Sequence, residues 1–188
     1  IKAVIFDYYD VLATDQYWHS VTEYATKNHQ LEEIYFAQQG LNNGSITWTD
    51  FCKKISTVMH QSVDDVVNGY DGVYLNQDVL NAVKNIKNKY KVALLSNAGA
   101  EQLSAQLNHK GIDVLFDEII ISSEVGVSKP SMDIFVYAAQ KLQCLPSECI
   151  MIDDNKDNIL GAKSCSMTAI HFKDIQQLQE ALKDKVEL

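Results

Sequence analysis

Four short apolar segments of the chain each lead into a side chain that could take part in phosphate, metal or covalent chemistry. These side chains are Asp7, Ser96, Lys129 and the neighbouring pair Asp153 and Asp154. A carboxylate can attack an electrophile or hold a cation, and a lysine can neutralise a transferring anionic group. A serine hydroxyl can hydrogen-bond to phosphoryl oxygens. We therefore expect these side chains to act together at one site.

The pair Asp153-Asp154 is the strongest local signal of chemistry. It directly follows the apolar run 149–152, and two adjacent carboxylates at a buried edge repel each other. That repulsion costs free energy unless a cation or a nearby lysine compensates the charge. Asp157 and Asn158 follow closely and are positioned to orient the pair or to cap the next helix. Each of the other candidates, taken alone, is more typical of a cap, a turn or a surface lysine.

The elements around these residues alternate between strand and helix. Short apolar runs typical of buried parallel strands occupy residues 3–6, 91–98, 116–125, 148–154 and 168–172. Helical spacing of apolar residues follows at 79–90, 100–111, 131–143, 158–166 and 175–186. This alternation predicts an α/β fold with right-handed crossovers and a doubly wound parallel sheet. Ligands bind at the carboxyl ends of such strands, so the candidate residues should converge on one crevice.

The first strand is followed by a helical insertion. From about residue 16 to residue 69 the pattern is helical and polar-faced, with Thr47 and Ser62 as N-cap candidates. We expect three or four short helices there, and we divide the chain into a core of residues 1–14 and 71–188 and a cap of residues 15–70.

The aromatic side chains of the insertion leave two interpretations open. Trp18, Tyr24 and Trp48 could line the site, but aromatic residues in small helical bundles more often form the bundle core. His19 follows the first apolar segment closely and is more typical of a surface or packed histidine. These residues give no readable code for a substrate.

Composition limits the partners. A net charge of −9 argues against binding nucleic acid or an anionic membrane surface. No apolar run approaches ~18 residues and no charged-then-apolar leader is visible, so we expect neither a membrane span nor a signal peptide. Four cysteines without paired spacing indicate reduced thiols in a cytoplasmic protein. All 16 cationic side chains are lysine, so no guanidinium is available to bind carboxylate or phosphate.

Taken jointly, the stretches FDYYDVL, LLSNA, SKPSMDIF and MIDDNKDN resemble the motifs of the haloacid dehalogenase (HAD) superfamily. The motifs span residues 3–158, and the insertion resembles the small C1-type helical cap of some members. Residues 43–46, followed by a Trp and a Phe, are similar to the cap of sugar-phosphatase-like members. The resemblance implies a Rossmann-like core and a Mg²⁺-dependent hydrolase that acts on a small-molecule phosphate ester.

The resemblance also implies a role for each matching residue. Asp7 would attack phosphorus, form an aspartyl phosphate and bind Mg²⁺. Asp154 would bind the metal directly, Asp153 would bind it through water or pair with the lysine, and Tyr9 would contribute its backbone carbonyl. The residues implied to hold and neutralise the phosphoryl group are Ser96, Asn97 and Lys129.

The chain departs from the family pattern at one position. Phosphatases of the family carry a second aspartate two residues after the nucleophile, as general acid and base, and this chain has Tyr9 there. Asp10 comes one residue late and would point to the other face if the strand continued. A phenol with a pKa of ~10 could donate a proton but is a poor base near neutrality. Loss of acid–base help typically costs roughly 10²–10⁴ in rate.

Three functions therefore stand as hypotheses. We prefer a phosphatase that is slow or specialised because of Tyr9. A tyrosine at this position also resembles the 2-haloacid dehalogenases of the family, whose halide leaving group needs no proton, although the paired acids and the lack of arginine oppose this. The third hypothesis is a catalytically impaired protein that binds phosphate and metal.

Overall fold

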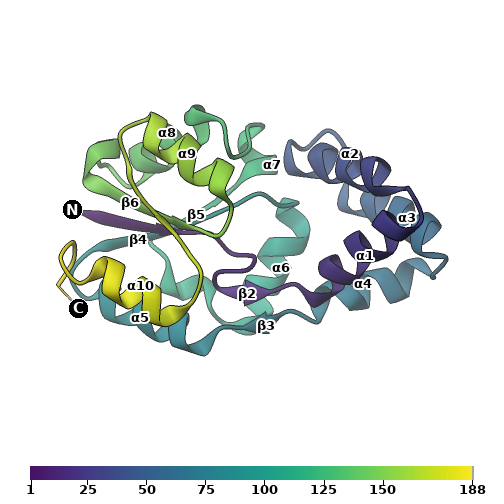
Figure 1. The fold of residues 1–188 in the computed structure, drawn as a ribbon, viewed down its shortest axis with the longest axis horizontal. Coiled ribbons are helices and arrows are strands. Elements are labelled where there is room, and N and C mark those ends of the chain that lie inside the picture. Colours follow the sequence, from purple (N-terminus) through teal and green to yellow (C-terminus); the bar gives the residue numbers. More distant parts are fainter. Residues whose placement is uncertain (188) are drawn as a thin grey trace.

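A computed structural model describes residues 1–187 of the chain (Figure 1). Its centre is a five-stranded parallel sheet in the order β5-β4-β1-β6-β7. The strands are β1 (Ala3–Phe6), β4 (Lys91–Ser96), β5 (Glu118–Ile121), β6 (Cys149–Asp153) and β7 (Thr168–His171). The doubly wound parallel α/β sheet predicted from the sequence is confirmed.

Helices cover both faces of the sheet because β1 is apolar on both. Val4 and Phe6 face one cluster and Ala3 and Ile5 the other, and all four are fully buried. Burying a large apolar side chain contributes roughly 1.5–3 kcal/mol. The first face is covered by α5 (Gln77–Lys87), α6 (Ala100–Lys110) and α10 (Ile175–Leu182). The second face is covered by α8 (Met132–Lys141) and α9 (Lys156–Ser164).

Four helices form a separate helical unit beside this α/β unit, on the right of Figure 1. They are α1 (Gln16–Lys27), α2 (Leu31–Asn42), α3 (Trp48–Met59) and α4 (Val63–Asp71), and they share a hydrophobic cluster of their own. The predicted caps are confirmed: Thr47 Oγ1 accepts from the Asp50 N–H and Ser62 Oγ from the Asp65 N–H, each at 3.1 Å. The domain limits at residues 14 and 71 stay a prediction.

The sequence pattern did not predict several small elements. A two-stranded antiparallel ribbon of β2 (Ala13–Thr14) and β3 (Tyr74–Leu75) joins the two units. The expectation of a strand over 116–125 is wrong in its second half, because β5 ends at Ile121 and the short helix α7 (Ser122–Val125) follows. Two 3₁₀ turns complete the fold, η1 (Asp113–Leu115) and η2 (Pro146–Glu148). Within residues 1–187, no helix is long and apolar enough to cross a membrane.

Candidate active site

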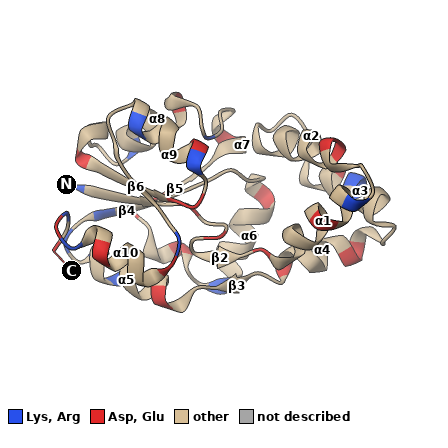
Figure 2. Cartoon of the chain, viewed as in Figure 1, with Lys and Arg blue, Asp and Glu red and all other residues tan. Residues whose placement is uncertain are grey.

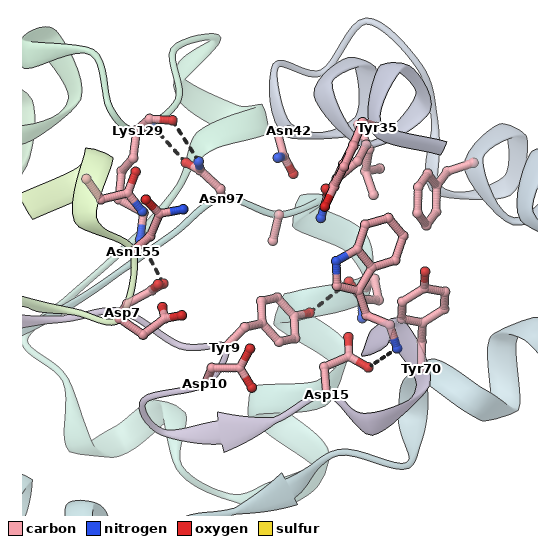
Figure 3. A pocket seen from close by; sticks show the side chains of 18 of the residues that line it. Asp7, Tyr9, Asp10, Asp15, Tyr35, Asn42, Tyr70, Asn97, Lys129 and Asn155 are labelled. Carbon is pink, nitrogen blue, oxygen red and sulfur yellow. Dashed lines mark hydrogen bonds and ion pairs between the residues drawn. The ribbon is translucent and has the colours of Figure 1, made fainter. Parts of the chain in front are cut away.

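The predicted crevice lies at the carboxyl edge of the sheet. Asp7 comes directly after β1, Asp153 is the last residue of β6, and Asp154 follows it. Lys129 reaches the same point from the loop between α7 and α8, where its Nζ lies 2.8 Å from Asp7 Oδ1 and 2.7 Å from Asp153 Oδ2. The structure thus brings together acids from opposite ends of the chain around one buried lysine, of which Figure 3 shows Asp7 and Lys129.

The ammonium group of Lys129 is fully engaged. Besides the two carboxylates, it donates to the Leu95 carbonyl at 3.1 Å, so its three N–H donors have three acceptors. Burial alone would lower the pKa of Lys129, but Asp7 and Asp153 together raise it above its ordinary value. This lysine is therefore a permanent positive charge held at the floor of the site.

One lysine does not balance three carboxylates. Burial, and then the neighbouring Asp153, raise the pKa of Asp7 to about 8, although Lys129 opposes the shift. Burial, and then Asp153 and Asp10, raise the pKa of Asp154. Burial is the larger cause of both shifts and the neighbouring carboxylates add to it, and a bound cation would oppose both.

The donor set fits a hard divalent cation. Asp7, Asp153 and Asp154 each offer one carboxylate oxygen, and these oxygens lie within 4.8 Å of one another. Oxygen donors of this kind suit Mg²⁺. The two oxygens of Asp153 are already bound by Lys129 and by the Asn158 side-chain amide at 3.0 and 3.1 Å. Its pairing with the lysine matches one of the two arrangements that the family resemblance implied.

Two asparagines hold the charged groups in place. The Asn97 amide makes a reciprocal pair with the backbone of Lys129, both hydrogen bonds being 2.9 Å (Figure 3). Asn158 donates to Asp153, in agreement with the interpretation that it orients the acidic pair. In this structure Asn97 positions the lysine loop, and its predicted contact with a substrate stays a prediction.

Ser96, the other predicted phosphate-binding residue, is fully buried at the end of β4. Its hydroxyl has no hydrogen-bond partner among residues 1–187. It is not one of the residues that line the adjacent cavity, whereas Asn97 and Ala98 are. The predicted contact of Ser96 with a phosphoryl group stays a prediction.

A cavity of about 320 Å³ lies between the carboxyl edge of the sheet and the helical unit. Its floor is formed by the α/β unit, from which Asp7, Asn97, Lys129 and Asp154 contribute. Its opposite wall comes from the helical unit and is mainly aromatic, with Trp18, Tyr35, Trp48, Phe51 and Tyr70. These rings also pack on one another, so both interpretations of the tryptophans hold at once.

A family model described as haloacid dehalogenase-like hydrolase matches residues 1–166 of the chain. The chain belongs to this family. Over 105 residues, the HAD-like hydrolase is 34% identical to the glyceraldehyde 3-phosphate phosphatase of Methanothermobacter thermautotrophicus, a stretch that covers 55% of this chain and 46% of that protein. The chain spans less than half the length of the first curated relatives that it matches.

Two solved structures share the fold of this HAD-like hydrolase. One is a HAD family enzyme from Bacteroides thetaiotaomicron in complex with magnesium and inorganic phosphate, with a TM-score of 0.73, 20% identity and coverage of 92% of this chain and 94% of that chain. The other is the L-2-haloacid dehalogenase of Xanthobacter autotrophicus with chloropropionic acid covalently bound, with a TM-score of 0.67, 20% identity and coverage of 98% and 83%. The assignment to the C1 cap type and to the sugar-phosphatase-like branch stays a prediction.

The Tyr9 side chain lines the cavity, and its hydroxyl is held by a neighbouring amide. Its hydroxyl donates to Gln102 Oε1 at 3.2 Å, and Figure 3 shows it pointing away from Asp7. Burial raises the pKa of Tyr9 well above its ordinary value, so the phenol keeps its proton. The predicted role of the Tyr9 hydroxyl as a proton donor stays a prediction. Its carbonyl oxygen accepts none of the backbone hydrogen bonds that close this turn within residues 1–187, and its role as a metal ligand stays a prediction.

The condition on which the expected orientation of Asp10 depended, a strand that continues past residue 7, is not met. β1 ends at Phe6, and Asp10 adopts a left-handed conformation with φ 59°, so strand alternation does not apply. Asp10 lines the cavity, and its Oδ1 lies 3.1 Å from His19 Nε2 on α1. Sequence reasoning also missed Asp15 and Gln102 in the cavity wall, because no motif contains them.

Proposed function

We propose that this chain is a Mg²⁺-dependent phosphatase of small phosphorylated metabolites that works through an aspartyl phosphate on Asp7. The observation that carries the proposal is the lysine-bridged acid cluster, in which Lys129 binds Asp7 and Asp153 and one carboxylate oxygen of Asp154 lies within 4.8 Å of one from each of them. Curated relatives named as phosphatases support the reaction class.

The two oxygens of Asp7 have different tasks. Oδ1 accepts from the Tyr8 N–H at 2.7 Å and from Lys129 Nζ at 2.8 Å, which fixes the carboxylate plane. Oδ2 has no hydrogen-bond partner among residues 1–187, so it is the oxygen free to attack phosphorus. A bond forms from Oδ2 to phosphorus, the bond to the ester oxygen breaks, and the alcohol leaves with that electron pair. Water then attacks phosphorus and releases inorganic phosphate, which restores the carboxylate.

Asp7, Asp153 and Asp154 would hold Mg²⁺, with the Tyr9 carbonyl as a further donor. The metal supplies positive charge beside the transferring phosphoryl group. Lys129 offsets negative charge from the other side, and its three fixed acceptors keep it from moving during the reaction.

The leaving oxygen receives no proton from Tyr9, because Gln102 holds the hydroxyl. Asp10 is paired with His19 at the cavity wall, so water protonates the leaving oxygen. Without general acid help, esters of acidic alcohols should react much faster than alkyl esters, by up to roughly 10²–10⁴.

The test is hydrolysis of p-nitrophenyl phosphate with and without Mg²⁺. We expect turnover that needs the metal and is abolished in Asp7→Asn. Absence of metal-dependent turnover across a panel of phosphate esters would contradict the proposal. A rise in melting temperature with Mg²⁺ and a phosphate ester, without any turnover, would instead indicate a binding protein.

A 2-haloacid dehalogenase is the second candidate, favoured by Tyr9 two residues after the nucleophile, where phosphatases of the family carry a carboxylate. Release of a halide needs no proton donor, so the engaged Tyr9 hydroxyl is no handicap. The acidic pair and the lack of any arginine in the sequence oppose it. Chloride release from 2-chloropropionate without metal would support this reaction, and its absence would remove it.

A further inference from the structure

The cavity wall on the side of the helical unit indicates what the phosphate is attached to. We infer that the preferred substrates are phosphate monoesters whose leaving alcohol carries no negative charge, and that the wall rejects esters with a second anionic group. This inference rests on the proposed phosphatase and specifies its substrate class.

The first argument is the charge of the lining. Lys129 is the only cationic side chain among the lining residues of the described chain, and its three donors are already bound. Two further carboxylates, Asp10 and Asp15, line the cavity beyond the metal site. Figure 2 shows acidic and no basic positions along the segment that leads from β1 through β2 to α1. Lys156 at the start of α9 is exposed and is not a lining residue.

The second argument is that one of these carboxylates is fixed by the fold. Asp15 caps α1 by accepting from the Trp18 N–H at 2.8 Å, and only 6% of the residue is exposed. An anionic substituent that enters this space would lose its water shell, find no free cation and lie near like charges. A neutral or cationic substituent meets none of these costs.

The third argument is the chemistry of the rings. Trp48 stacks on Phe51 with 5.6 Å between ring centroids and meets Tyr70 edge-on at 5.2 Å, so the rings of the wall support one another. The negative faces of aromatic rings attract cations and tolerate neutral groups. The amide side chains of the lining, among them Gln38, Asn42 and Gln102, add neutral polar groups.

Two unpaired polar atoms indicate that the ligand also brings neutral hydrogen-bonding groups. Gln102 Nε2 and the Tyr70 hydroxyl are buried and have no partner among residues 1–187, and both residues line the cavity. Buried polar groups cost free energy until they find a partner. A hydroxyl on the leaving alcohol could satisfy either of them without bringing charge.

Three esters on one two-carbon skeleton test the inference. They are 2-phosphoglycolate, 2-hydroxyethyl phosphate and phosphoethanolamine, whose alcohols carry a negative, a zero and a positive charge. We expect kcat/KM with Mg²⁺ to be at least about tenfold higher for the neutral and cationic esters than for 2-phosphoglycolate. Equal or faster turnover of 2-phosphoglycolate would overturn the inference and leave the proposed phosphatase standing.

A charge variant tests the wall directly. Gln38→Lys adds a cation to the lining, and we expect it to narrow the ratio of kcat/KM between 2-hydroxyethyl phosphate and 2-phosphoglycolate by about tenfold. Gln39→Lys makes the same substitution one residue along α2, at an exposed position outside this cavity, and should leave the ratio unchanged. An unchanged ratio in Gln38→Lys, or an equal change in both variants, would contradict the inference.

Binding separates this inference from the reaction itself. Dissociation constants of the three esters are measured with Mg²⁺ on Asp7→Asn, which cannot form the aspartyl phosphate. The weakest binding is expected for 2-phosphoglycolate. That order without turnover by the natural sequence would remove the proposed phosphatase and keep the selectivity, whereas tightest binding of 2-phosphoglycolate would remove the selectivity.

Discussion

The α/β unit and the helical unit contribute to the same cavity in opposite ways. The α/β unit presents charges that are fixed by buried partners, with Asp153 fully buried and Lys129 only 4% exposed. The helical unit presents aromatic faces and amides, with one buried carboxylate, Asp15, at its edge. A buried charge is costly unless its partners are in place, so each group of the acid cluster depends on the others. The aromatic wall contains no buried ion pair. We therefore expect substitutions of its residues to change which substrates bind and to leave the acid cluster intact.

Tyr9→Asp gives the α/β unit the carboxylate that it lacks and should have the largest effect. We expect kcat/KM for an alkyl ester such as 2-hydroxyethyl phosphate to rise by roughly 10²–10⁴, because the leaving oxygen gains a general acid. Steady-state kinetics with Mg²⁺ measure the gain. Tyr9→Phe removes only a hydroxyl that points toward Gln102 and should not reproduce it. A gain below about tenfold would mean that something other than the missing carboxylate limits turnover.

Lys129→Met removes the buried positive charge of the α/β unit. Asp7 and Asp153 would remain buried without a cation, so we expect the free energy of unfolding to fall by about 3–5 kcal/mol at pH 8 in EDTA. Urea unfolding measures the loss, and it should shrink at lower pH as the carboxylates take up protons. Lys141→Met is the control, since Lys141 is 3.9 Å from Glu118 at the surface, and it should cost less than about 1 kcal/mol. Similar losses in both variants would contradict this account of the cluster.

Asp15→Asn should raise the free energy of unfolding, whereas Lys129→Met lowers it, because the Asp15 carboxylate of the helical unit has no cation to pair with. Burial raises the pKa of Asp15 from its ordinary 3.8 to about 6, so the folded state holds a proton that the unfolded chain releases. The stability that protonated Asp15 contributes is therefore lost as pH rises from about 4 through 6. At pH 8 the ionised carboxylate costs up to roughly 3 kcal/mol.

The asparagine variant keeps the N-cap, because its carbonyl can still accept from the Trp18 N–H. Urea unfolding should therefore find Asp15→Asn more stable than the natural sequence at pH 8, with the two nearly equal near pH 4. Asp64→Asn, at an exposed position in the first turn of α4, serves as control and should change stability by less than about 1 kcal/mol. An Asp15→Asn protein that is less stable at pH 8 would show that the carboxylate has a compensating partner.

The same contrast explains what the sequence could predict. Buried parallel strands read as continuous apolar runs, so the five strands and the convergence of Asp7 with Asp153 followed from pattern and topology. The turn after β1 is different. The left-handed conformation of Asp10 and the hydrogen bond from the Tyr9 hydroxyl to Gln102 on α6 depend on tertiary contacts rather than on strand alternation.

The aromatic wall of the cavity could not be predicted from the sequence for a related reason. Helical spacing shows that Trp18 and Trp48 lie on apolar faces, but it does not show which end of the bundle opens toward the sheet. The β2–β3 ribbon that joins the units and the contact of α2 with α7 decide that, and two-residue strands such as β2 leave no periodic signal in the sequence. Neutral polar residues such as Gln38 and Gln102 belong to no sequence motif, so nothing in the sequence assigns them to the cavity.

The contact between the two units can be tested with a single methyl group. Gly44, in the loop after α2, has φ 77°, and a Cβ there would lie 2.8 Å from the Ser123 carbonyl oxygen on α7. Gly44→Ala should therefore lower the free energy of unfolding by about 1 kcal/mol, because alanine is strained at this φ, and should also push α2 away from the α/β unit. Because Leu41 and Asn42 at the end of α2 line the cavity, we expect KM for 2-hydroxyethyl phosphate to rise. Gly111→Ala has a similar φ of 64° with nothing within 4 Å, so it should lose similar stability by urea unfolding while KM stays the same. If both variants left KM unchanged, the contact between the two units would matter for stability but not for substrate binding. The contribution of the helical unit to binding would then not depend on how closely α2 approaches α7.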